Sequence, residues 1–222
     1  MKHLSRMITA HNCFCSFLYN LGTLVIMPVL LIPFSLFLMH SEKYFGILFV
    51  MIILVSLIII ADYGPYNGIT VKGFFLGMIL NSTHTEAFMK DAILADQIRR
   101  FIQIAFPTTV SVIIYSIRYP NKTDIKFMII TLTLILFNYS ITTVTLMLLR
   151  NLHSNQAYIS TTFLLSILFS ALNAGILLLC LHDRIKISFM IVFLSVLILS
   201  VIISISSFRY TTDHCLTNIR EN

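Results

Sequence analysis

Charged residues are scarce in this sequence, and their scarcity argues against a water-soluble fold. Only 11% of the 222 residues are Asp, Glu, Lys or Arg, whereas a soluble domain carries about 25%. Hydrophobic residues make up 58% of the chain, and its mean hydropathy is +0.92. Apolar runs such as residues 45–61 and 187–208 have the length of about 20 residues that crosses a bilayer. The sequence therefore predicts an all-α membrane protein.

Cysteine is also sparse, with four residues that form no framework of spaced pairs, so we expect free thiols rather than disulfides. The start of the chain lacks the features of a cleaved signal peptide, because residues 1–20 mix polar and apolar side chains. This segment suits a helix lying in the membrane interface. A polar lead into the first span is the alternative.

Sequence motifs for catalysis are missing. A nucleotide-binding loop needs Lys and Ser or Thr after its second glycine, but Gly68 and Gly73 are followed by Phe74 and Phe75. The seven histidines include no zinc-binding H-E-x-x-H pattern, and no nucleophile elbow of the type G-x-S-x-G is present. We therefore expect no catalytic residues, no metal site and no ATP hydrolysis by this chain.

The apolar runs predict six transmembrane helices in a single domain that covers residues 1–222. Their approximate limits are 21–39, 45–61, 101–117, 127–149, 158–181 and 187–208. Six spans place both termini on one side of the membrane. Lys and Arg are modestly more frequent in the segments on that side, which predicts cytoplasmic termini. The positive net charge is thus a feature of topology, and we expect no nucleic-acid partner.

The longest polar stretch, residues 62–100, connects the second and third predicted spans. Thr83 and Glu86 have the spacing of a helix capping box, and apolar residues recur on one side of the segment that follows. The charged positions of this stretch are expected in water or at the membrane interface. The pattern predicts an amphipathic helix that leads into the third span.

Polar residues within the predicted spans are the remaining functional signal, because they must face protein or water rather than lipid. They are Asn138, Tyr139, Ser166, Ser170 and Asn173. One interpretation is that they line a translocation path. The other is that they form hydrogen bonds between packed helices.

The loop before the third span reads Leu-Asn-Ser-Thr-His-Thr-Glu-Ala-Phe-Met-Lys-Asp-Ala-Ile over residues 80–93. It resembles the integral-membrane permease subunits of bacterial ABC-2 type exporters. The resemblance implies an N-terminal interfacial helix, six spans and a cytoplasmic coupling helix between spans two and three. The implied ATPase-coupling residues are Ser82, Thr83, Thr85, Glu86, Phe88, Met89, Lys90 and Asp91.

The same resemblance implies partners and a location. A separate ABC ATPase subunit would bind ATP and Mg, a second permease copy or a homologous permease would complete the transporter, and both termini would be cytoplasmic in a multi-pass protein of the bacterial cell membrane. The expected cargo is an amphipathic or hydrophobic substrate such as an antimicrobial peptide. Alternatives are a haem-exporter-like permease, a membrane processing enzyme and an accessory scaffold.

Overall fold

The computed structural model describes residues 5–9, 12, 15, 17–61, 85–149, 155–181 and 189–220, and within these residues all regular structure is helical. Residues 5–9 form a short helical segment. The labelled elements, in chain order, are α2 (Phe17–Leu21), the π-helix η1 (Gly22–Ile26), α3 (Met27–Ser41), α4 (Lys43–Ala61), α7 (Thr85–Arg118), the 3-10 helix η2 (Pro120–Lys122), α8 (Ile125–Leu149), α9 (Asn155–Leu181) and α10 (Phe189–Arg220).

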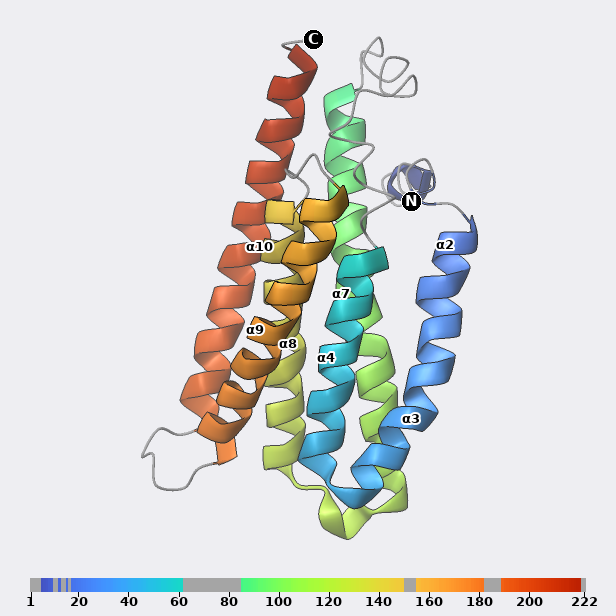
Figure 1. Cartoon of the computed structure of the whole chain (residues 1–222), viewed down its shortest axis with the longest axis vertical. Coiled ribbons are helices and arrows are strands. Elements are labelled where there is room, and N and C mark those ends of the chain that lie inside the picture. The colour runs from blue at the N-terminus through green and yellow to red at the C-terminus, as the bar shows by residue number, and fades with distance from the viewer. Residues whose placement is uncertain are drawn as a thin grey trace.

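The long helices lie roughly side by side and alternate in direction (Figure 1). Helix α2, η1 and α3 follow one another as a continuous helical stretch, Phe17–Ser41. The beginnings of α2 and α7 and the end of α10 lie at one end of the bundle, which we call the terminal end. The short α3–α4 and α7–α8 connections lie at the other, which we call the turn end.

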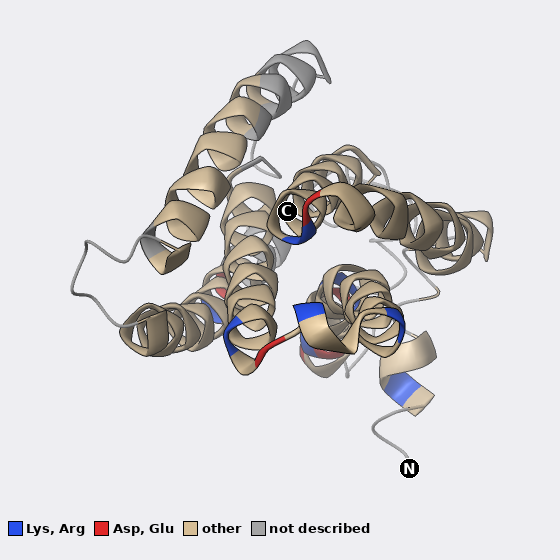
Figure 2. Ribbon diagram, turned by 90° about the horizontal axis from the view of Figure 1, so that it is seen from below, with Lys and Arg blue, Asp and Glu red and all other residues tan. Residues whose placement is uncertain are grey.

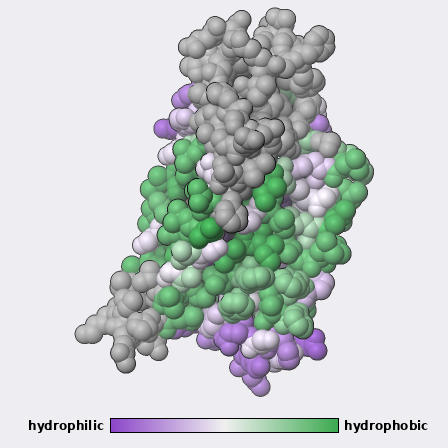
Figure 3. Space-filling model, viewed as in Figure 1, coloured by the Kyte–Doolittle hydropathy of each residue, from purple (hydrophilic) through white to green (hydrophobic). Residues whose placement is uncertain are grey.

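Five of the described helices are long and apolar enough to cross a membrane, and they are Phe17–Ser41, Lys43–Ala61, Glu86–Arg118, Ile125–Leu148 and Phe189–Asp213. In α9, the described apolar stretch Ile167–Leu178 is shorter. Seen from the turn end, most of the described ribbon carries neither acidic nor basic residues (Figure 2). A hydrophobic belt covers the visible face, with hydrophilic residues at the turn end (Figure 3). The chain is therefore a multi-pass membrane protein.

Helix α8 packs against four other helices, α4, α7, α9 and α10. It is also rich in buried hydroxyl groups. Thr131, Thr133, Ser140 and Thr142 each donate a hydrogen bond to the backbone carbonyl four residues earlier, at 2.7–2.9 Å. These bonds satisfy the hydroxyls within their own helix, so polar residues can occupy an apolar interior without an aqueous cavity.

At the turn end, α3 and α4 meet at a close contact that requires glycine. A Cβ atom on Gly46 would lie 2.6 Å from the backbone nitrogen of Met39, well inside van der Waals contact. Met39 is itself buried, with 1% of its surface exposed. The absence of a side chain at Gly46 thus lets the first turn of α4 pack directly on the last turn of α3.

Two helices extend beyond their predicted spans. The third predicted span, residues 101–117, is only the second half of α7, which begins at Thr85 without a break. The sixth, residues 187–208, overlaps α10, which begins at Phe189 and continues to Arg220. Both extensions project at the terminal end (Figure 1).

Candidate functional site

The first half of α7 contains a buried ionic cluster. The Asp96 carboxylate accepts hydrogen bonds from Arg99 Nη2 at 2.7 Å and from Arg100 Nη2 at 2.5 Å. The three residues are spaced three and four positions apart, which places them on neighbouring turns of one helix face. Their exposed fractions are 0%, 4% and 2%. The sequence predicted these charges in water or at the membrane interface. That prediction was wrong for these three residues, because they are enclosed by protein.

The N-terminal segment, residues 5–9 and α2, contacts this half of α7 at two points. Arg6 forms an ion pair with Asp91, and the guanidinium of Arg99 donates to the Tyr19 hydroxyl. The Arg99 guanidinium carbon also lies 5.1 Å from the centre of the Tyr19 ring, a cation–π distance. These contacts join residues about 80 positions apart in the chain, so the N-terminal segment is fastened to the start of α7.

Apolar contacts reinforce the same assembly. Cys15, Met89 and Ile93 form a buried cluster that Tyr19 and Phe208 help to cover. The Gln97 side-chain amide donates to the backbone carbonyl of Ser204 in α10 at 3.2 Å. We call the first half of α7 with the segments packed on it, residues 5–9, α2 and the Ser204–Phe208 region of α10, the terminal platform.

The predicted ATPase-coupling residues occupy different environments. Ser82 and Thr83 lie outside the described residues, and Thr85 is the first residue of α7. Glu86 and Lys90 are exposed and form an ion pair at 2.5 Å.

The other coupling residues face inward to different degrees. Phe88 is half-buried, whereas Met89 and Asp91 are buried. The latter two contact the N-terminal segment within this chain. Among the described coupling positions, the exposed surface thus centres on the Glu86–Lys90 pair.

The spacing of charges along α7 places the platform relative to the membrane. Between Arg100 and Arg118 the helix has no charged residue, and at 1.5 Å per residue this stretch is about 27 Å long. That length is close to the hydrocarbon thickness of a bilayer, about 30 Å. The segment that begins at Thr85 and ends near Arg100 therefore lies in the interface and the adjoining water.

A second polar feature lies in the bundle interior, where the predicted residues Asn138 and Asn173 meet. Asn138 Nδ2 donates to Asn173 Oδ1 at 2.7 Å, and Asn173 Nδ2 donates to Asn138 Oδ1 at 2.9 Å. Each amide also donates to the carbonyl four residues earlier, Leu134 and Phe169. Both asparagines are fully enclosed. In this conformation the pair joins α8 to α9, which is the helix-packing role.

Of the other polar residues predicted within spans, Tyr139 also contacts neighbouring helices. Tyr139 accepts a hydrogen bond from the Ser204 hydroxyl at 2.9 Å, and the Phe101 ring meets it edge-on with centroids 5.5 Å apart. Ser170 is half-buried, and the side chain of Ser166 lies outside the described residues. Asn138, Asn173 and Tyr139 thus all link α8 to neighbouring helices.

The sequence interpretation did not include Gln103, which is 2% exposed in α7. Neither its amide nitrogen nor its carbonyl oxygen has a hydrogen-bond partner among the described residues, and the same holds for the Thr143 hydroxyl of α8. Pro107 lacks the N–H that would bond the Gln103 backbone carbonyl. The sequence did contain a signal for this unpaired polar site, because Gln103 lies four residues before Pro107 within a predicted span.

Within the described residues, no group of three His, Cys, Asp or Glu side chains could hold a metal ion. Hydrogen bonds and ion pairs at the two polar features hold neighbouring helices together. No family model matches this chain, and no curated protein or solved structure matches it either.

Proposed function

We propose that this chain is the six-span permease subunit of a bacterial ABC exporter that moves an amphipathic or hydrophobic substrate, such as a peptide, out of the cell. ATP would be hydrolysed by a separate subunit on the cytoplasmic side, where the terminal end lies. In this proposal α9 crosses the membrane as the fifth of six spans and α10 is the sixth. Residues 5–9 belong to the interfacial helix, and the start of α7 belongs to the coupling helix.

The observation that carries the proposal is the continuity of α7. This helix runs for 34 residues, from the exposed Glu86–Lys90 pair, through the terminal platform and across the apolar belt to Arg118. A soluble partner that presses on the exposed first turns would therefore move a transmembrane segment directly. Transmission of an ATPase movement to the spans needs this kind of connection.

The buried ionic cluster supports the same role for the platform. Asp96 ties Arg99 and Arg100 to one helix face, and Arg99 bonds to Tyr19. A force applied to the platform is thus shared between α7 and the start of the first span. A loosely attached loop would dissipate such a force through its own flexibility.

The described surface also supports assembly with a second copy. The described part of α10 exposes large apolar side chains over its whole apolar length, among them Leu194, Ile198, Ile202 and Ile205. The asparagine pair packs α8 on α9 inside one chain. We therefore place the substrate path between two permease copies, with the α10 surface available to lipid or to the second copy.

Copurification tests the proposal. The chain is tagged, expressed with the open reading frames that adjoin its gene, and extracted in mild detergent. We expect an ABC ATPase to copurify and its ATP hydrolysis to respond to substrate. Failure to recruit any ATPase under these conditions would contradict the permease assignment.

Charge variants locate the contact. Lys90→Glu is expected to weaken ATPase recruitment or to uncouple hydrolysis from transport, because Lys90 lies on the exposed part of the platform. Arg209→Glu provides the matched control, since it reverses an exposed charge in α10. If both variants had the same effect, the contact would not be centred on the start of α7.

A further inference from the structure

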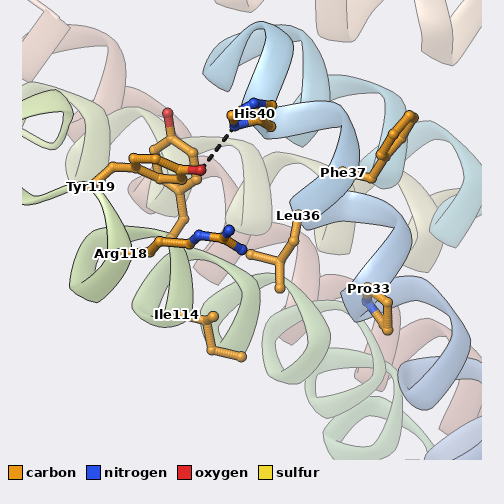
Figure 4. A pocket seen from close by; sticks show the side chains of 8 residues that line it. Pro33, Leu36, Phe37, His40, Ile114, Arg118 and Tyr119 are labelled. Atoms are coloured by element: carbon orange, nitrogen blue, oxygen red, sulfur yellow. Dashed lines mark hydrogen bonds between the residues drawn. The ribbon is translucent and has the colours of Figure 1, made fainter.

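A cavity of about 430 Å³ lies at the turn end, between the last turns of α3 and α7. Its wall is apolar on one side, where Leu36, Phe37 and Ile114 contribute, and polar at its rim, where His40, Arg118 and Tyr119 contribute. Figure 4 shows the Arg118 side chain reaching across the opening toward Leu36. The volume falls within the range of small-molecule sites, about 300–1,000 Å³.

The polar rim has capacity for an anion. Arg118 makes no ion pair and no hydrogen bond within the part of the chain that the structure describes. Its guanidinium carbon lies 5.6 Å from the centre of the Tyr119 ring, a cation–π distance. Its guanidinium therefore has N–H groups available in the geometry that matches a phosphate or carboxylate.

The His40–Tyr119 pair adds a further donor. Nδ1 of His40 and the Tyr119 hydroxyl lie 2.9 Å apart. If the tyrosine donates, the imidazole proton is on Nε2; if the imidazole donates from Nδ1, the tyrosine proton is unused. In either arrangement one N–H or O–H of the pair can still be donated to a ligand.

The apolar wall opens toward lipid rather than toward water. Phe37 is 72% exposed and Ile114 is 40% exposed, and both belong to helices that form the hydrophobic belt. Arg118 is the last residue of α7 and His40 precedes the last residue of α3, so the polar rim lies at the membrane interface. A molecule that fills this cavity has its charge at the interface and its apolar part in the hydrocarbon region.

We propose that this cavity binds an anionic phospholipid, with the phosphate on Arg118 and on the His40–Tyr119 pair and the first part of an acyl chain against Leu36, Phe37 and Ile114. A free phosphate would satisfy the rim but would leave the apolar wall uncovered. The site does not depend on the transport function, because it requires only that the chain spans a membrane.

Native mass spectrometry of the detergent-solubilised protein tests the site. Phosphatidylglycerol, phosphatidylcholine with the same acyl chains, and inorganic phosphate are titrated separately. We expect phosphatidylglycerol to bind most tightly and Arg118→Gln to weaken it about tenfold or more, as expected for loss of a charge-assisted contact. Lys122→Gln is the control, because it removes the same charge from an exposed residue at the same end that does not line the cavity. Its Nζ lies 5.4 Å from the centre of the Tyr119 ring, so its loss is expected to change the affinity, but much less than the loss of Arg118.

A second variant, Phe37→Ser, tests whether the apolar wall binds an acyl chain. Phe37→Ser is expected to weaken phosphatidylglycerol severalfold and to leave any phosphate binding unchanged. Equal losses in Arg118→Gln and Lys122→Gln would overturn the site in favour of diffuse charge attraction. Inorganic phosphate that binds as tightly as the lipid would overturn the lipid assignment, and loss of a dimer rather than of lipid in Phe37→Ser would show that the wall is an interface between copies.

Discussion

The first half of α7, residues 85–100, and its second half, residues 101–118, differ in how they place charge. In the first half, Asp96, Arg99 and Arg100 are buried and paired with one another. The second half holds one charged residue, Arg118, which is exposed at the rim of a cavity. Burial of an ion costs several kcal/mol unless its partners replace the lost water. The three buried charges therefore need one another as partners, whereas the exposed Arg118 does not need an ionic partner.

The two ends of the bundle place their charges differently. At the terminal end the buried charges Asp91, Asp96, Arg99 and Arg100 form ion pairs and hydrogen bonds within the chain, two of them with the N-terminal segment. At the turn end the basic group is left available, and the backbone itself provides the close packing, through Gly46 against Met39. Substitutions at the two ends should therefore differ in their effects on stability and on ligand binding.

The largest expected effect is at the terminal end. Asp96→Ala removes the acceptor shared by Arg99 and Arg100, and breaking a buried pair of this kind costs about 3–5 kcal/mol. We expect a large loss of folded, monodisperse protein in detergent, measured as recovery in size-exclusion chromatography after a heat step. Glu86→Ala is the control, because its partner Lys90 is exposed; if both variants behaved alike, the platform would not depend on the buried cluster.

A smaller effect is expected at the turn end, where Gly46→Ala introduces a Cβ that collides with the backbone of Met39. Overpacking of this kind costs about 1–3 kcal/mol. Gly175→Ala is the matched variant, since a Cβ at that position of α9 meets nothing within 4 Å and alanine favours a helix by up to about 1 kcal/mol. Thermal unfolding should lower the midpoint of the first variant and maintain or raise that of the second, and a reversed order would contradict the close contact.

The third expected effect on stability is at the Asn138–Asn173 pair, which lies in the bundle interior between the two ends. Asn138→Leu and Asn173→Leu should each destabilise the protein, because each leaves one buried amide without its partner. The double variant should be less harmful than the sum, with a coupling of about 0.6–1.7 kcal/mol. Unfolding titrations in mixed micelles give this double-mutant cycle; strict additivity would show that the two amides do not stabilise one another.

The smallest expected effect is at the exposed pair of the platform. Lys90→Gln breaks the ion pair with Glu86, and exposed pairs four residues apart in a helix contribute about 0.3–0.5 kcal/mol. The unfolding midpoint should therefore barely change, and high salt should remove what difference exists. A loss of stability as large as that of Asp96→Ala would mean that the Glu86–Lys90 pair belongs to the structural core. The distinction between a buried cluster and an exposed pair would then be wrong.

Much of the fold could be predicted from the hydropathy of the sequence, since long apolar runs specify membrane helices without reference to their neighbours. The amphipathic start of α7 was predictable for the same local reason. The burial of Asp96, Arg99 and Arg100 was not, because it depends on tertiary packing; Arg99, for example, contacts Tyr19, which lies 80 positions earlier in the chain. Helical periodicity describes one helix and contains no information on what covers it.

The candidate site shows the same limit. Asn138 and Asn173 could be recognised as unusual within spans, but their pairing depends on the rotation of α8 against α9, which the sequence does not specify. The cavity at the turn end was not anticipated at all. It lies where α3 and α7 end, and two of its lining residues, His40 and Tyr119, are 79 positions apart in the chain.

The continuity of α7 has a thermodynamic consequence for its two ends. At 1.5 Å per residue the helix is about 51 Å long, and Glu86 and Arg118 are attached to the same body. If one tilt of this rod favours both a partner at Glu86 and a lipid phosphate at Arg118, then each ligand raises the affinity of the other by the same factor. The lipid composition around the turn end would then act as an effector of events at the opposite surface of the membrane.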